Sequence, residues 1–275
     1  MSEVQKFELT EETHPSAPWL RRIRALVDIP AAGVRAGDLG GWVESEACLA
    51  HSGDAWVSGD ARVYGAARVS GAARVSGDAR VSGDAWVSGD ARVSGAARVS
   101  GDAWVSGDAR VSGDARVSGD ARVYGAARVS GAARVSGDAR VSGDAWVSGD
   151  ARVYGAAWVS GDARVSGDAR VSGDARVSGD ARVSGDAQVY GPDHTLTAGP
   201  LSSQGHHGTL TRQPDGGHQI IIGCWSGTTD ELRELAAAKD WPSSCDKKTR
   251  ERYAPRLIAF AALCDAQISV WEGSK

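Results

Sequence analysis

Apolar and polar positions alternate along the middle of the chain with a period of six residues. From Ala55 to Pro192 the pattern Ala-x-Val-x-Gly-x repeats without a break, and Val fills every sixth position from Val57 to Val189. This gives 23 six-residue units, called hexads below, each with Ala two residues before its Val. Residues six apart lie about 240° apart around an α-helix, so the period excludes an amphipathic helix.

A period of six suits a short β-strand followed by a corner. In Arg-Val-Ser, Val points to one side of the strand and its neighbours to the other. Gly permits the backbone angles of a sharp turn, and the Asp that follows most of these glycines is favoured in turns. Three hexads close one coil, so equivalent positions stand 18 apart in the sequence. The pattern therefore predicts a mainly β fold, a left-handed parallel β-helix (hexapeptide β-solenoid) about 37 Å long at about 4.8 Å per coil.

The opposing interpretation is a disordered, low-complexity segment rich in Gly, Ala, Ser and Asp. Val and Ala at the inward positions of all 23 hexads argue against it. Burying one Val per hexad contributes about 1.5–3 kcal/mol, which does not by itself offset about 1–2 kcal/mol of ordering cost per residue. The backbone ladder between coils, with both ends covered, must supply the rest.

The segment before the repeat, residues 1–54, is predicted to cap the coil stack. Residues 6–9 and 19–26 have the pattern of two strands joined by a loop that contains Pro. Val43 and Leu49 already stand six apart, so the solenoid is expected to begin there, with a two-residue insertion before Val57.

After the repeat domain, 55–192, the composition changes and residues 193–275 are predicted to form a small α+β domain. Residues 209–212 and 218–225 suggest a hairpin around the turn residues 214–217. Thr228 or Thr229 is expected to cap a helix that has acidic residues in its first turn. A second helix is expected over about 246–266, kinked or broken by Pro255.

The repeat resembles that of left-handed β-helix acyltransferases, which place an aliphatic residue first and a small one fifth, as Val57 and Ala61 stand here. The resemblance implies trimeric enzymes with a His as general base. The six histidines of this chain all lie outside the unbroken run, and no loop interrupts it. Because a general base must reach its substrate, acyl transfer stays an alternative rather than the main prediction. No catalytic residue and no cofactor are predicted.

The two flanks resemble hexapeptide-repeat proteins encoded by phages and prophages. The segment 37–44, Gly-Asp-Leu-Gly-Gly-Trp-Val-Glu, looks like their opening, and 222–228, Ile-Gly-Cys-Trp-Ser-Gly-Thr, is similar to their C-terminal domain. This resemblance implies a phage protein that acts in the cytoplasm of a bacterium, and it supplies no catalytic residue.

Charge and composition narrow the remaining classes. Acidic residues exceed basic ones by four, and the rod carries 17 Arg against 17 Asp, so neither nucleic acid nor an anionic membrane is an expected partner. The longest apolar run, Leu257–Cys264, is far shorter than the roughly 20 residues of a membrane span. The start of the chain lacks the apolar stretch of a secretory signal, and the four cysteines show no CxxC spacing.

Two groups of residues are candidate binding sites. In the C-terminal domain they are His206, His207, His218 and Trp225; with His194 and Cys224 the histidines could hold zinc, but solvated loop histidines are favoured and no metal site is predicted. On the rod, assigning hexads to three faces puts four outward aromatics on one face: Trp86, Trp104, Tyr124 and Trp158. Exposed aromatics often mark interfaces.

An internal duplication weakens the case for a binding stripe on the rod. Residues 63–93 are identical to 123–153, and the offset is ten hexads, which is not a multiple of three. The copied block is therefore rotated by one face, which moves the counterpart of Trp86, Trp146, away from the stripe. Most hexads then serve as spacer.

The main hypothesis is a non-enzymatic phage interaction protein. A rigid and oligomeric solenoid would present the C-terminal domain to a host protein or a host-derived small ligand, with counter-defence as a possible role. The alternatives are a structural spacer or virion-associated rod, and the acyltransferase.

Overall fold

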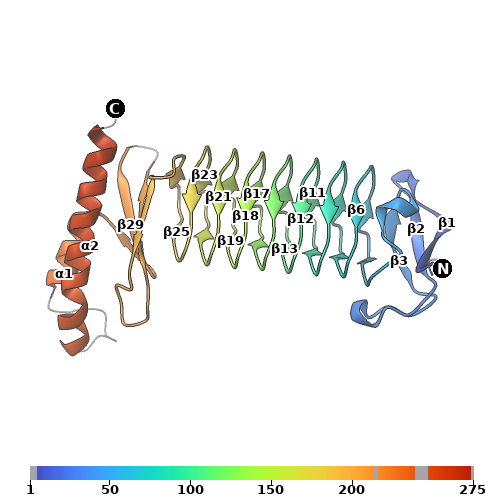
Figure 1. Cartoon of the computed structure of the whole chain (residues 1–275), viewed down its shortest axis with the longest axis horizontal. Helices are drawn as coiled ribbons and strands as arrows, with labels where there is room; N and C mark the ends of the chain where they lie inside the picture. The colour runs from blue at the N-terminus through green and yellow to red at the C-terminus, as the bar shows by residue number, and fades with distance from the viewer. Residues whose placement is uncertain (1–4, 214–215, 239–246, 274–275) are drawn as a thin grey trace.

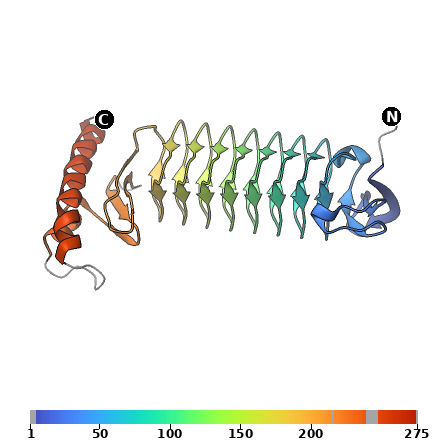
Figure 2. The same ribbon diagram turned by 60° about the horizontal axis from the view of Figure 1, so that its bottom comes forward.

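The computed structural model describes residues 5–213, 216–238 and 247–273. It shows a straight rod between two caps, with the chain termini at opposite ends (Figure 1). The same arrangement is seen after a rotation about the rod axis (Figure 2). The protein is a mainly β, parallel β-solenoid of about eight turns with 18 residues per turn, followed by a small α+β region, as the sequence predicts. The left-handed sense of the coil stays a prediction.

Each hexad contributes one two-residue strand, and the strands stack on three faces. The β4 face contains β4 (Trp56–Val57), β7 (Arg74–Val75), β10 (Arg92–Val93), β13 (Arg110–Val111), β16 (Arg128–Val129), β19 (Trp146–Val147), β22 (Arg164–Val165) and β25 (Arg182–Val183). The β5 face contains β5 (Arg62–Val63), β8 (Arg80–Val81), β11 (Arg98–Val99), β14 (Arg116–Val117), β17 (Arg134–Val135), β20 (Arg152–Val153), β23 (Arg170–Val171) and β26 (Gln188–Val189). The β6 face contains β6 (Arg68–Val69), β9 (Trp86–Val87), β12 (Trp104–Val105), β15 (Arg122–Val123), β18 (Arg140–Val141), β21 (Trp158–Val159) and β24 (Arg176–Val177).

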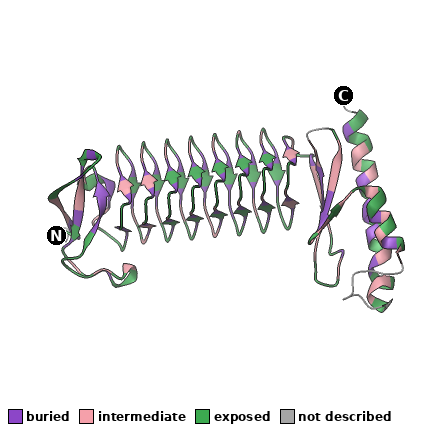
Figure 3. Cartoon of the chain, turned by 180° about the vertical axis from the view of Figure 1, so that it is seen from behind, coloured by how far each residue is buried: buried purple, intermediate pink, exposed green. Residues whose placement is uncertain are grey.

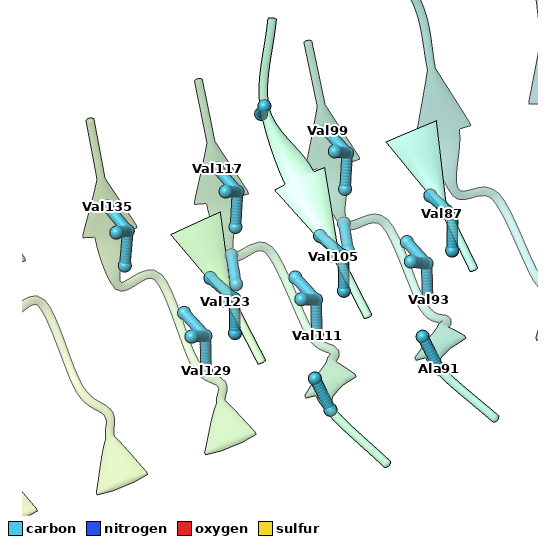
Figure 4. Packing of buried hydrophobic residues seen from close by; sticks show 14 of the residues in the cluster. Val87, Ala91, Val93, Val99, Val105, Val111, Val117, Val123, Val129 and Val135 are labelled. Carbon is cyan, nitrogen blue, oxygen red and sulfur yellow. The ribbon is translucent and has the colours of Figure 1, made fainter. Parts of the chain in front are cut away.

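The repeat folds this way because each position of the hexad has a distinct structural role. Val and Ala point inward and are almost fully buried, and each Val pairs with its equivalent on the next coil, as Val93 does with Val111 (Figure 4). The corner glycines from Gly53 to Gly185 all have positive φ, between +60° and +72°. In the interior a Cβ there would lie about 3 Å from the backbone of the next coil. A side chain at these corners would therefore meet both strain and a clash.

The N-terminal cap continues the β5 face. It consists of β1 (Phe7–His14), β2 (Ala17–Ala25), a 3₁₀ turn at Pro30–Ala32, β3 (Leu39–Val43) and a 3₁₀ turn at Glu46–Cys48. β1 and β2 form a hairpin, and β2 pairs antiparallel with β3. β3 then pairs in parallel with β5, Val43 opposite Val63, while Leu49 bridges to Val69. Partners within the rod are 18 residues apart in the sequence, and the partners in both of these pairs are two residues further apart. The coil stack therefore begins at Val43, with two extra residues in its first turn.

The C-terminal region is an antiparallel four-stranded sheet covered on its outer side by two helices (Figure 1). Its strands are β27 (Thr195–Ala198), β28 (Gly208–Arg212), β29 (His218–Ile222) and β30 (Trp225–Gly227), and its helices are α1 (Thr229–Ala237) and α2 (Lys247–Gly273). Thr228 caps α1, its hydroxyl accepting a hydrogen bond from the Glu231 N–H, as predicted.

The predicted hairpin is present, since β28 and β29 pair antiparallel with Arg212 opposite His218. Two of its expected turn residues, 214–215, lie outside the described part of the chain, as does residue 246 at the expected start of the second helix.

Two expectations for this region are wrong, and one strand lies where none is expected. The strand expected over 218–225 divides at Gly223, whose φ of +62° permits a tight turn between β29 and β30. β27 was not predicted. The second helix continues through Pro255 to Gly273. Tyr253 and Leu257, on either side of the proline, are both buried, and this packing holds the helix together across Pro255. Trp271, whose indole N–H donates to the Asp193 carbonyl, holds the final turn in place.

Candidate functional site

The structure separates the histidines that the sequence analysis grouped in the C-terminal domain. His206 and His207 precede β28 and lie near Ile222 and Gly223, while His218 starts β29 opposite Arg212. His218 and Ile222, at the two ends of β29, are four residue steps apart on an extended strand, which corresponds to about 14 Å. Within the described residues, no three His, Cys, Asp or Glu side chains converge as a metal site would require.

His206 makes a contact within the loop that contains both histidines, and His207 attaches this loop to the rod. The ring of His206 contacts the Ser202 hydroxyl through Nδ1, at 3.1 Å. Nδ1 of His207 lies 3.1 Å from an oxygen of Asp180 at a corner of the last coils. Together with Arg164, Arg182 and Asp162 this loop borders a polar cavity of about 360 Å³. The two histidines therefore lie at the junction between rod and cap.

His218 belongs to a different, aromatic cluster. Its ring stacks on Trp271 of α2 at 5.5 Å between centroids, and His194 lies edge-on to Tyr190 at 3.8 Å. Burial lowers the pKa of His194, so its imidazole is neutral at pH 7. Trp225, the remaining C-terminal candidate, lies on β30 and packs partly buried against the core beneath the helices. The four C-terminal candidates thus do not form one site.

The four candidate aromatics of the rod lie on the β6 face. Trp86 and Trp104, on adjacent coils, stack at 5.5 Å with an 11° angle between rings. Each rod tryptophan from Trp86 onward donates its indole N–H to a Ser one coil earlier, as Trp104 does to Ser88 at 3.3 Å. The rings therefore lie across the sheet, and these tryptophans are between 38% and 44% exposed. Trp158 is on the same face but two coils beyond the strand that precedes Tyr124.

Trp104 and Tyr124 border a cavity of about 240 Å³ on this face. Its lining, which we call the aromatic groove, consists of Trp104, Ser106, Arg122, Tyr124 and Arg140. Arg122 pairs in the β ladder with Trp104 and Arg140 with Arg122, so the groove spans three consecutive coils. Both aromatics are among the candidates predicted from the sequence, and the two arginines that complete the groove are not.

The arginines of the rod are not in direct ion pairs with its aspartates. In the part of the chain that the structure describes, every Arg–carboxylate contact within 4 Å lies in the N-terminal cap or the C-terminal domain. The equal numbers of Arg and Asp therefore balance charge over the rod surface without fixing individual side chains. Guanidinium groups along each face stay available to a partner.

The outer face of α2 is a second candidate surface, and the sequence analysis did not identify it. Ile258, Leu263 and Val270 are about half exposed, and three alanines complete an apolar strip: Ala259, Ala262 and Ala266. Figure 3 shows exposed residues along the length of this helix. Beside it, Pro200, Leu201 and Phe260 help to border an apolar cavity of about 480 Å³. The spacing of Ile258, Ala262, Ala266 and Val270 by four was the signal available in the sequence.

Lys6 is another residue whose role sequence reasoning missed. Only 3% of it is exposed, and Nζ donates to the carbonyls of Gly53 and Ala55, at 3.2 and 2.9 Å. Burial lowers its pKa to about 8, an effect that the nearby Asp54 opposes. No motif surrounds this lysine, so nothing in the sequence singles it out.

Comparison with protein families matches the rod to the YdcK beta solenoid repeat. Nine segments match: 52–71, 73–89, 85–101, 91–107, 115–131, 133–149, 145–161, 163–178 and 175–191. The rod is similar to this repeat. The match supports the β-solenoid and concerns neither the N-terminal cap nor the C-terminal domain. No curated protein matches the chain. None of the described helices combines the length and apolar character needed to cross a membrane.

Proposed function

We propose that the protein is a non-enzymatic interaction scaffold: a rigid solenoid that holds a C-terminal contact module at a fixed distance from the N-terminal cap. The observation that carries this proposal is the outer face of α2. Large apolar side chains exposed together are costly in water and are typical of protein interfaces. The face lies at the end of the rod, where a scaffold would make its contact.

The chemistry of the rest of the chain supports a binding role rather than a catalytic one. The described histidines of the C-terminal domain take part in packing or in the junction with the rod. Burial raises the pKa of the Cys264 thiol to about 12, with a smaller contribution from Asp265, so this thiol is not a nucleophile at neutral pH.

We propose that the occupant of the α2 face is a second copy of the chain. The first half of the helix is basic, with Lys248, Arg252 and Arg256 exposed, and its last turn carries Glu272. Arg252 and Glu272 stand ten residues before and after Ala262. In an antiparallel pair centred on Ala262, the basic first half of each helix would lie alongside the acidic last turn of the partner helix. Such a two-fold interface is complementary to itself.

The resemblance of both flanks to phage proteins suggests the setting. The assembled scaffold would act inside a bacterium and engage a host protein or a host-derived small ligand, with counter-defence as its role. A structural spacer is the second candidate, favoured by the unbroken ladder of uniform hexads. Deleting three consecutive hexads removes one coil in register; a spacer would lose activity on this change, and a binder would tolerate it.

Native mass spectrometry of the full chain tests the scaffold. We expect twice the 28.5 kDa chain mass at micromolar concentration, and a single chain for Leu263→Asp, which places a charge in the apolar strip. The matched control is Ala96→Asp, which adds the same charge at a rod corner where most hexads carry Asp, and it should remain a dimer. A single-chain mass for the natural sequence, or an unchanged dimer for Leu263→Asp, would overturn the proposed interface.

A further inference from the structure

Four of the five residues of the aromatic groove, all except Ser106, occur in the same arrangement twice in the molecule. In each copy a Trp is followed on the next coil by Arg-x-Tyr and on the coil after that by Arg. The first copy is Trp42, Arg62, Tyr64 and Arg80 on the β5 face, and the second is Trp104, Arg122, Tyr124 and Arg140 on the β6 face. The ladder register is the same in both: each Trp pairs with the first Arg, and that Arg with the second.

The two copies differ in whether they are covered. Trp42 is 4% exposed, because it packs in one cluster with Ala17 and Leu20 of the β1–β2 hairpin, with Tyr64 against it. Trp104 is 41% exposed and borders an open cavity of about 240 Å³. Four of the five lining residues match, and Glu44 takes the place of Ser106, so the chain itself shows what fits over the shared residues.

The first copy is covered by the β1–β2 hairpin, whose strand β2 also pairs with β3, with Arg22 opposite Trp42. His14 lies edge-on to the Trp42 ring at 5.0 Å, and Leu20 is buried beside the same ring. Burial lowers the pKa of His14, and the charges of Arg62 and Arg80 lower it further against a smaller, opposite effect of Asp60. His14 therefore lies near the two guanidinium groups, while Leu20 and the Arg22 guanidinium, 5.2 Å from the ring centroid, cover Trp42.

The second copy is more positive, because Ser106 lines it where the first copy carries Glu44. Arg122 and Arg140 are in no ion pair within the described chain. Guanidinium groups at the edge of an apolar groove attract a carboxylate, which bonds them more strongly than a neutral group does.

We infer that the aromatic groove binds another protein through an extended or hairpin segment that places a branched aliphatic side chain against Trp104 and Tyr124 and a carboxylate beside Arg122 and Arg140. The groove lies on the rod, apart from the α2 face. The rod would then contribute a binding surface of its own, in addition to setting distance.

The chain supplies its own probe for this site. A peptide of residues 7–25, closed into a ring through its backbone, copies the hairpin that fills the first groove; its ends already lie together, with Phe7 opposite Ala25. It carries Leu20 and, near its tip, Glu11 and Glu12. The same ring with Leu20→Ser is the control peptide.

The measurement is ¹⁹F NMR of the full chain labelled with 5-fluorotryptophan, titrated with each peptide. We expect the native ring to shift the signals of Trp104 and of Trp86, which stacks on it, and to leave Trp146 on the β4 face unchanged. The Leu20→Ser ring should bind at least fivefold more weakly.

Protein variants complete the test without disturbing the fold. Trp104→Arg with Tyr124→Ser installs the residues that most hexads carry at these positions, and it should weaken peptide binding at least fivefold. Trp146→Arg, the matched control, should bind as the natural chain does. No saturable shift, equal shifts of all exposed tryptophans, a shift of Trp42 in place of Trp104, or unchanged affinity in the double variant would each overturn the inference.

Discussion

The two ends of the solenoid meet opposite hydrogen-bonding problems with different chemistry. Inside the rod the N–H of Arg68 donates to Ala85 of the next coil, and every coil repeats this pattern. The first coil therefore has carbonyls with no preceding coil to donate to them, and the last coil has N–H groups with no coil to accept them. At the first end the buried ammonium of Lys6 donates to Gly53 and Ala55. At the last end the Thr209 hydroxyl accepts the N–H of Arg182 at 3.0 Å.

This comparison shows that the cap of a solenoid must satisfy the unpaired backbone donors or acceptors of the terminal coil as well as cover its apolar core. A cation can satisfy two carbonyls at once, but its burial has a free-energy cost that depends on pH. A hydroxyl satisfies one N–H and carries no charge. The N-terminal end should therefore respond to pH, and the C-terminal end should not.

The largest effect is expected for Lys6→Met in alkaline solution. In the natural folded chain the pKa of Lys6 is about 8, below the value near 10.5 in the unfolded chain. Between these two pH values the unfolded chain binds more protons, so the stability of the natural chain rises with pH. At pH 10 the neutral amine of Lys6 still donates to both carbonyls, so the Lys6→Met substitution should lower the free energy of unfolding by about 2–4 kcal/mol.

At pH 7 the difference in unfolding free energy between the natural chain and Lys6→Met should be smaller, because burying the charged ammonium destabilises the natural chain. Thermal unfolding of both proteins from pH 7 to 10.5 measures the difference, with the exposed Lys248→Met as control. A gap that stays constant over this range would contradict the role assigned to Lys6.

An intermediate effect is expected for Gly107→Ala in the interior of the rod. Its φ is +67°, and an added Cβ would lie 3.0 Å from the N atom of Gly125. Strain and clash together should cost about 2–3 kcal/mol. Gly179→Ala is the matched control, since Gly179 has a φ of +63° but open space around it, and should cost only about 1 kcal/mol. Equal shifts in the thermal midpoints would show that stacking between corners adds nothing.

The smallest effect is expected for Thr209→Val, which keeps the shape of the side chain and removes the acceptor for the Arg182 N–H. Thr209 is fully buried, so the loss should be about 1–2 kcal/mol and independent of pH. Hydrogen exchange should accelerate at the Arg182 amide. The exposed Thr13→Val, at the other cap, should leave that amide unchanged; equal protection in both variants would remove Thr209 from the end of the ladder.

Sequence reasoning located the candidate residues of the rod better than those of the C-terminal domain. The period fixes which hexads share a face, and so it correctly placed Trp86, Trp104, Tyr124 and Trp158 together on the β6 face. His206 and His218 are only twelve residues apart in the chain, and yet β29 places them at opposite ends. Distance along an aperiodic segment carries no such information. The binding roles assigned to these residues stay predictions.

By itself the sequence determined the coil, its three faces, its inward Val and Ala and its starting point at Val43, because in a periodic chain each residue meets its equivalents one coil away. Tertiary structure decided which contacts the two caps make with this periodic rod. It brought Lys6 to the orphaned carbonyls, turned the apolar strip of α2 outward, and laid the β1–β2 hairpin over Trp42 while leaving Trp104 open. These outcomes depend on contacts between segments that share no period, and only folding in three dimensions selects among them.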